Sequence, residues 1–140
     1  MPNSEDSGNR LLSIADYQWG EASNELQVGL WISASSIEIG GTVDARAAVR
    51  NLSNHRMRLG NEFGLAIEVK GETFEDLSGP RSGSTTWLKP GEFREVVGWR
   101  ISEQINQQAG VYRCSAVYHR AKGGDLHSAV ISIETKASSH

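Results

Sequence analysis

The chain has 140 residues, 38% of them hydrophobic, which is enough to bury the core of a single domain without metals or disulfides. Its formal net charge of -3 argues against a nucleic-acid-binding role, because such domains usually carry a basic excess that neutralises phosphates. The single cysteine, Cys114, excludes an internal disulfide and is compatible with a reducing compartment.

The ends of the chain are polar. No apolar run approaches the roughly 20 residues that a membrane-spanning helix needs, so no membrane span is expected. Residues 1–10 are polar and acidic, whereas a signal peptide begins basic and continues apolar. We therefore expect a soluble protein, with a cytoplasmic location favoured. We expect residues 1–16 to be a flexible tail, residues 17–135 to form one domain and residues 136–140 to be a second tail.

The segment from Leu11 to Trp19 is open to two interpretations, a short strand or a cover over the edge of the fold, with Tyr17 and Trp19 as anchors. Beyond it, alternation of apolar and polar residues predicts a series of strands. They cover residues 26–33, 43–49, 63–69, 93–101, 111–118 and 126–135, with shorter pieces at 57–59 and 86–88.

The connections between these strands carry turn signals. Ile37 and Ile39 should continue the first strand until Gly40–Gly41 forces a turn, and Lys89–Glu92 is a further turn. Residues 57–69 form either one bent strand or two. Residues 71–85 are the longest irregular segment, and helical spacing is sustained nowhere, with one or two turns at most in residues 101–109.

Two strands define the expected core most clearly. Phe93, Val97, Trp99 and Ile101 should share one face, and so should Tyr112, Cys114, Ala116 and Tyr118. Short strands separated by regularly spaced turn signals are typical of a sandwich. The sequence therefore predicts an all-β, immunoglobulin-like β-sandwich of about seven to eight antiparallel strands.

Three stretches resemble known immunoglobulin-like families. Gly110-Val-Tyr-Arg-Cys114 is similar to strand F of the immunoglobulin fold, where the tyrosine hydroxyl ties back the preceding loop. The partner cysteine of antibody domains is missing from residues 43–49. The Pro90-Gly-Glu92 turn, the Trp99 strand and the G-x-Y motif together resemble bacterial domains of the intracellular proteinase inhibitor (BsuPI) type. Trp19-Gly-Glu21 and the stretches that follow it through Ser53 resemble uncharacterised bacterial immunoglobulin-like modules found beside signalling and peptidase domains.

An immunoglobulin-like strand order would bring the loops after residues 49, 88 and 118 to one end of the sandwich. This end would be basic, suited to an acidic protein surface or an anionic ligand. The candidate partner-binding residues are His55, Arg56, Arg58, Lys89, His119, Arg120 and Lys122, with Arg50 and His127 at the flanks. The competing interpretation is that these are ordinary solvated loop side chains.

No residue constellation indicates an enzyme, and no cofactor or metal is expected. His55 and Met57 with His119 or His127 would be the only candidate copper or zinc ligands, but no multi-ligand motif is present. Cys114 lies in the register of a core thiol, so it is not expected to be a nucleophile. The four tryptophans could form a sugar-stacking surface, although Trp99 should be core and Trp31 lies out of register with its strand.

These patterns favour a non-catalytic binding module that recognises a protein partner through apical loops or an exposed strand edge. The alternative, implied by the resemblance alone, is an intracellular-type proteinase inhibitor. The oligomeric state is left open by the sequence.

Overall fold

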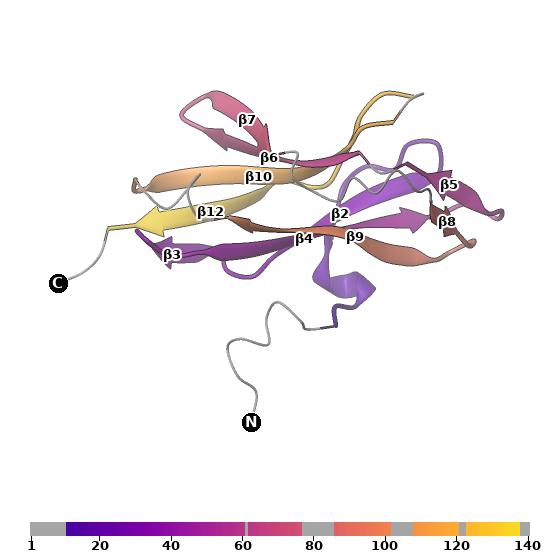
Figure 1. Ribbon diagram of the computed structural model, residues 1–140, viewed down its shortest axis with the longest axis horizontal. Coiled ribbons are helices and arrows are strands. Elements are labelled where there is room, and N and C mark those ends of the chain that lie inside the picture. Colours follow the sequence, from indigo (N-terminus) through magenta and orange to yellow (C-terminus); the bar gives the residue numbers. More distant parts are fainter. Residues whose placement is uncertain (1–10, 61, 77–85, 102–107, 121–122, 138–140) are drawn as a thin grey trace.

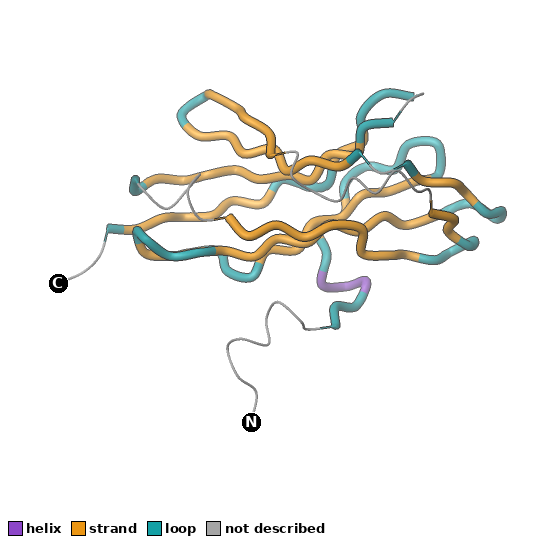
Figure 2. The backbone as a smooth tube through the Cα atoms, in the orientation of Figure 1, coloured by secondary structure: helices purple, strands orange, loops and turns teal. Residues whose placement is uncertain are grey.

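The computed structural model describes residues 11–60, 62–76, 86–101, 108–120 and 123–137. The fold is an all-β, immunoglobulin-like sandwich of two packed sheets (Figure 1, Figure 2). The expected tail over residues 1–10 lies outside the described residues, as do the possible helical turn over 102–107 and the glycine-rich part of the 71–85 segment. The described segments contain no helix with the length and hydropathy of a membrane span.

The first sheet has the strand order β1-β2-β4-β9, and every neighbouring pair is antiparallel. Its strands are β1 (Gln18–Trp19), β2 (Leu26–Ile32), β4 (Val43–Asn51) and β9 (Phe93–Ile101). The second sheet has the order β3-β12-β10-β6-β7, with β11 also paired to β10. Its strands are β3 (Ser36–Glu38), β6 (Phe63–Val69), β7 (Glu72–Asp76), β10 (Gly110–Tyr118), β11 (Leu126–His127) and β12 (Ile131–Lys136). A separate ribbon pairs β5 (Met57–Leu59) with β8 (Thr86–Leu88).

The core lies between the two sheets and is built from the alternating residues that the sequence predicts. The inward residues of β10, which are Tyr112, Cys114, Ala116 and Tyr118, are all buried. On β4 the inward side chains are small, and Ala45 lies opposite Trp99 on β9. The small residue leaves room for the indole, so Trp99 is only 6% exposed and is confirmed as core.

A β-bulge in β9 overturns the expectation that Phe93 shares the core face. Ala47 pairs with Val97 but the next residue, Ala48, pairs with Glu95, so Val96 is an extra residue on β9. The extra residue reverses the facing of everything before it. Phe93 consequently packs on the outer face, where its ring lies 6.3 Å from that of Trp19, and the prediction for this residue was wrong.

Three segment assignments also need correction or resolution. Residues 36–38 do not continue β2: β3 crosses to the other sheet and pairs in parallel with β12. Residues 57–69 are two strands in different sheets, because β5 pairs with β8 whereas β6 pairs with β10. Residues 72–76, expected to be irregular, form β7 as an antiparallel partner of β6. The strand predicted over residues 126–135 is two strands, β11 and β12, with an interruption between them.

The tyrosine motif of β10 behaves as the resemblance implies. The Tyr112 hydroxyl donates to the backbone carbonyl of Gln108 at 3.0 Å, which ties the end of the preceding loop to the strand. Cys114 is fully buried, and this burial raises the pKa of its thiol to about 12. A thiol that stays protonated is a packing group rather than a nucleophile.

The N-terminal part of the described chain covers the outer face of the first sheet. A 3₁₀ turn, Ile14–Asp16, precedes β1 within the stretch expected to be tail, and Trp19 Nε1 donates to the Ile14 carbonyl at 2.9 Å. Tyr17 is buried and its hydroxyl donates to Glu95 at 3.1 Å. Both earlier interpretations of this segment therefore hold in part, because it forms a short strand and covers the sandwich.

Candidate binding site at the apical end

Asn51, the last residue of β4, joins two of the apical loops from the inside. Its side chain is fully buried, and Nδ2 lies 2.9 Å from the His55 carbonyl and 3.1 Å from each of the Leu88 and Lys89 carbonyls. Its Oδ1 accepts from the Ser53 hydroxyl at 2.7 Å. One side chain thus fixes the loop after β4 against the end of β8.

The ribbon β5–β8 presents opposite chemistry on its two sides. Leu59 and Leu88 point inward and are buried. Arg58 pairs across the ribbon with Trp87, which is 47% exposed. The guanidinium of Arg56 lies 4.7 Å from the centroid of the Trp87 ring, a cation–π contact. The outer side of this ribbon therefore presents an exposed indole, with Arg56 over its ring and Arg58 opposite it on the neighbouring strand.

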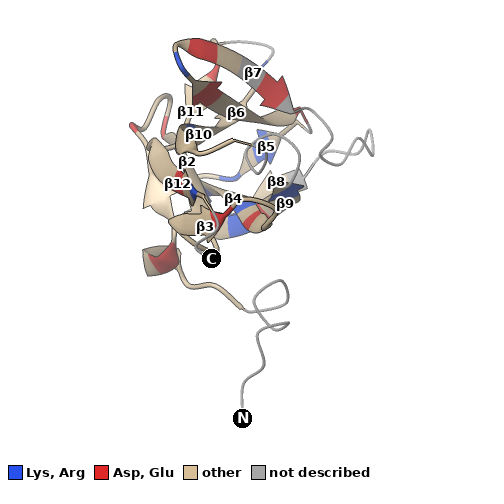
Figure 3. Cartoon of the chain, turned by 90° about the vertical axis from the view of Figure 1, so that its left-hand side faces the viewer, with Lys and Arg blue, Asp and Glu red and all other residues tan. Residues whose placement is uncertain are grey.

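Arg56 and Arg58 differ from the other arginines in their partners. Neither makes a hydrogen bond or ion pair with any residue in the described part of the chain. The other arginines within the described residues each contact an acceptor: Arg46 on Glu95, Arg50 on Gln27, Arg94 on Glu92, Arg100 on Asp44, Arg113 on Glu68 and Arg120 on the Gly124 carbonyl. Figure 3 shows the basic colouring of β5 set apart from the acidic residues of β7.

The candidate residues after β10 have partners within the protein. His119 contacts Glu75 through Nε2 at 2.5 Å and Asp125 through Nδ1 at 3.0 Å. The hydrogen bond to Glu75 is the main cause that raises the pKa of His119 above its usual value. Arg120 donates to the carbonyls of Gly123 and Gly124 at 2.7 and 2.8 Å, so it shapes its own loop.

The structure therefore divides the predicted basic end. Exposed His55, Arg56, Arg58 and Lys89 lie on or beside the β5–β8 ribbon, which we call the apical ribbon site together with Trp87. His119 and Arg120 belong to the loop after β10 and are held by neighbouring groups. Lys122 lies outside the described residues. Whether any of these residues binds a partner stays a prediction.

Sequence reasoning missed two contributors to this end. Asn51 follows the strand predicted over residues 43–49, and an Asn at a strand end followed by Leu-Ser has the capacity to bond several backbone groups. The sequence predicts Trp87 only as one of four possible sugar-stacking groups, and its alternation with Leu88 on a short strand is the available signal for an outward side chain. Among the described residues, no three His, Cys, Asp or Glu side chains are grouped to hold a metal ion.

No protein-family model matches the chain, and no curated protein sequence matches it. Solved structures do match. The alkylpurine DNA glycosylase AlkC of Pseudomonas fluorescens, bound to DNA containing an abasic-site analogue, is 10% identical with a TM-score of 0.54, over 81% of this chain and 31% of that chain. The β-glucosidase EmGH1 of Erythrobacter marinus is 13% identical with a TM-score of 0.50, over 79% of this chain and 15% of that chain.

These two similarities concern the fold alone, because sequence identity is low and this chain spans less than a third of either protein. The CARDB domain of the PF1109 protein from Pyrococcus furiosus, solved in complex with di-metal ions, also matches, at 11% identity over 84% of this chain and all of that domain. Its TM-score of 0.46 is too low to add to the argument. The class that the fold defines is a small all-β, immunoglobulin-like domain.

Proposed function

We propose that this chain is a non-catalytic binding module that holds a protein partner through the apical ribbon site. The observation that supports the proposal is the pair of exposed arginines, Arg56 and Arg58, that lie beside Trp87 without an acidic partner in the described part of the chain. Tryptophan and arginine, together with tyrosine, are enriched among the residues that dominate binding energy at protein interfaces.

The charge of the site indicates the kind of partner. Arg56, Arg58 and Lys89 add positive charge on one end of a protein whose formal net charge is -3. Such an asymmetry attracts a partner that presents carboxylates and turns this end toward it. Trp87 supplies apolar area at the centre of the site, and the arginines can form paired hydrogen bonds with carboxylates around it.

Two features favour a site that keeps its shape on binding. Asn51 fixes the adjoining loops through buried hydrogen bonds, and Arg56 already restricts the Trp87 ring. A side chain held in position loses less entropy when a partner arrives, which raises affinity for a given contact area.

The test is affinity capture with the double variant Arg56→Glu, Arg58→Glu and a matched double variant, Arg100→Glu, Arg113→Glu. Both change the net charge equally, but Arg100 and Arg113 lie away from the ribbon on β9 and β10. A specific protein retained by the wild type and by the matched variant, and lost with the first variant, is the expected result. Equal retention by all three proteins would refute the proposal.

The alternative, a proteinase inhibitor of the intracellular type, rests on the sequence resemblance. It would also use apical loops, so a separate assay distinguishes it. Inhibition of serine and cysteine proteases by the wild-type chain, abolished by Trp87→Ala, would favour the inhibitor over the general binding module. Capture of a partner without inhibition of any protease would favour the binding module.

A further inference from the structure

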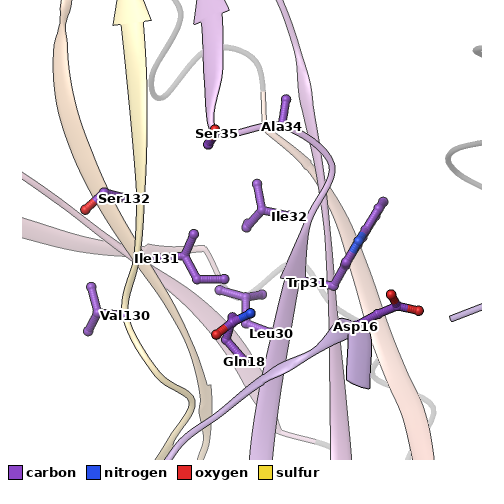
Figure 4. A pocket seen from close by; sticks show the side chains of 10 residues that line it. All are labelled: Asp16, Gln18, Leu30, Trp31, Ile32, Ala34, Ser35, Val130, Ile131 and Ser132. Atoms are coloured by element: carbon purple, nitrogen blue, oxygen red, sulfur yellow. The ribbon is translucent and has the colours of Figure 1, made fainter. Parts of the chain in front are cut away.

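A cavity of about 360 Å³ opens between the edges of the two sheets, on the side where the chain passes from β2 to β3. Its apolar walls are Leu30 and Ile32 on β2 and Ile131 on β12. Figure 4 shows Ile131 reaching toward Ile32 and Leu30, whereas Val130 and Ser132 lie on the other side of their strand. The Gln18 amide lies at the same opening, which we call the lateral window.

The lateral window is closed at both ends by backbone. At one end, residues 33–35 cross from the first sheet to the second. At the other end, Gly20 approaches the backbone of His127 so closely that a Cβ on Gly20 would lie 2.0 Å from the His127 carbonyl oxygen. The opening is therefore short, with room for one or two side chains rather than a long groove.

One margin of the lateral window is an open strand edge. Ser35 accepts a hydrogen bond from the Glu134 backbone N–H at 2.8 Å, and from there β3 covers β12 up to Lys136. Backbone groups of alternate residues point to the same edge of a strand. Those of Ser132 therefore point the same way as those of Glu134, and no described strand pairs with Ser132 on that side. Open edges of this kind accept an added strand.

We propose that the lateral window binds an extended peptide segment of a partner protein, which lies along the edge of β12 at Ile131 and Ser132, pairs with the backbone of Ser132 and places one aliphatic side chain between the sheets. The peptide residue opposite Ile131 shares its face, because directly opposed residues in a sheet point the same way. That side chain enters the cavity against Leu30 and Ile32. The open N–H and C=O groups select a peptide over a lipid or an apolar small molecule, because neither of those would pair with them.

This site is independent of the apical ribbon site, since the two share no residue. The probe is a pair of capped tripeptides, Val-Leu-Val and Val-Gly-Val, short enough to end before Ser35, titrated into the isotopically labelled full chain and followed by nuclear magnetic resonance. We expect saturable shifts at Val130, Ile131, Ser132 and Ile32 with the leucine peptide. The glycine peptide should bind at least about tenfold more weakly, because it buries no side chain.

Two variants test separately how the strand edge and the cavity contribute to peptide binding. Ser132→Pro removes the N–H at the open edge while leaving the groups that face β10 in place, so it should abolish leucine-peptide binding. Ile131→Phe fills the cavity and should reduce binding of the leucine peptide to that of the glycine peptide, which keeps the test valid if the proline variant fails to fold. Arg56→Glu with Arg58→Glu should bind the leucine peptide like the wild type.

Several outcomes would overturn the proposal. Equal affinities for the two peptides would show that no side chain enters the cavity. Absence of shifts at millimolar peptide would show that the edge does not accept a strand. Shifts at Val130–Ser132 that grow with protein concentration in the absence of peptide would assign the edge to a second copy of this chain instead.

Discussion

The carboxylate of Glu75 on β7 lies 2.5 Å from Nε2 of His119, a residue 44 positions further along the chain. Gly64 makes this approach possible, because a Cβ at that position would lie 1.9 Å from the same carboxylate oxygen. Asp125 contacts the other ring nitrogen at 3.0 Å. One imidazole therefore links the edge strand β7 to the loop that follows β10.

This link predicts a pH dependence of stability. The hydrogen bond to Glu75 raises the pKa of His119 above 6.5, with a smaller contribution from Asp125 and some opposition from partial burial. A group whose pKa is raised by folding contributes stability that is full below its unfolded pKa and is lost as pH rises through its folded pKa. We expect the free energy of unfolding to fall in that window.

The measurement is a series of urea titrations between about pH 6 and pH 9, with the His119 pKa followed by nuclear magnetic resonance. His119→Gln should remove this component of the pH dependence. His55→Gln, a change at an exposed histidine beside Asn54, should leave it in place. A His119 pKa at or below 6.5 in the folded wild type would contradict the account.

Gly64→Ala should break the link without disrupting the sheet. The atoms nearest to the new Cβ all belong to the Glu75 side chain, which is able to swing away. The expected result is a lower His119 pKa with β6 and β10 still paired, read from the imidazole titration and from cross-strand nuclear Overhauser effects. An unchanged His119 pKa would mean that Asp125 alone holds the proton.

Asn51→Ala should destabilise the domain by about 2–3 kcal/mol, because the buried carbonyl of Leu88 and the partly buried carbonyl of Lys89 lose their donor. Urea denaturation measures this loss. The neighbouring exposed Asn54 offers a control, since Asn54→Ala should cost less than about 0.5 kcal/mol. A similar small effect at both positions would show that the apical loops do not depend on Asn51.

Trp99→Ala should cost about 3–5 kcal/mol, as for other large-to-small changes of buried aromatic residues. Trp99→Phe should cost much less, because Nε1 is buried without a hydrogen-bond partner in the described part of the chain and phenylalanine removes it. Denaturant melts of the two variants provide the comparison. A loss below about 1 kcal/mol for the alanine variant would place Trp99 outside the core.

The regular part of the fold was predictable because its signal is local. The alternation of apolar and polar residues on β4 and β10 correctly predicts the core face of each strand, including the buried position of Cys114. The bulge at Val96 was not predictable, because Phe93 and Val97 have the same parity and the intervening residues read equally well in either register. The sequence also did not predict that β3 crosses to the second sheet, because Ile37 alternates in the same way whichever sheet it joins.

The sequence predicted which basic loop residues make up the candidate site. It did not predict which of them contact acidic residues within the protein. Nothing near His119 in the sequence indicates Glu75, since their contact depends on β7 folding back beside β6. The separate character of Arg56 and Arg58 is likewise a property of the assembled fold. It appears only when the acceptors of the other arginines are known.

We propose that Arg56, Trp87 and Arg58 form the surface that holds an acidic protein partner. The most direct measurement is the dissociation constant of the captured partner for the wild type, for Arg56→Glu with Arg58→Glu, and for the matched variant at Arg100 and Arg113. We predict at least about a tenfold weakening for the first variant only, with its free energy of unfolding within about 0.5 kcal/mol of the wild type. Equal dissociation constants for all three proteins would contradict the account.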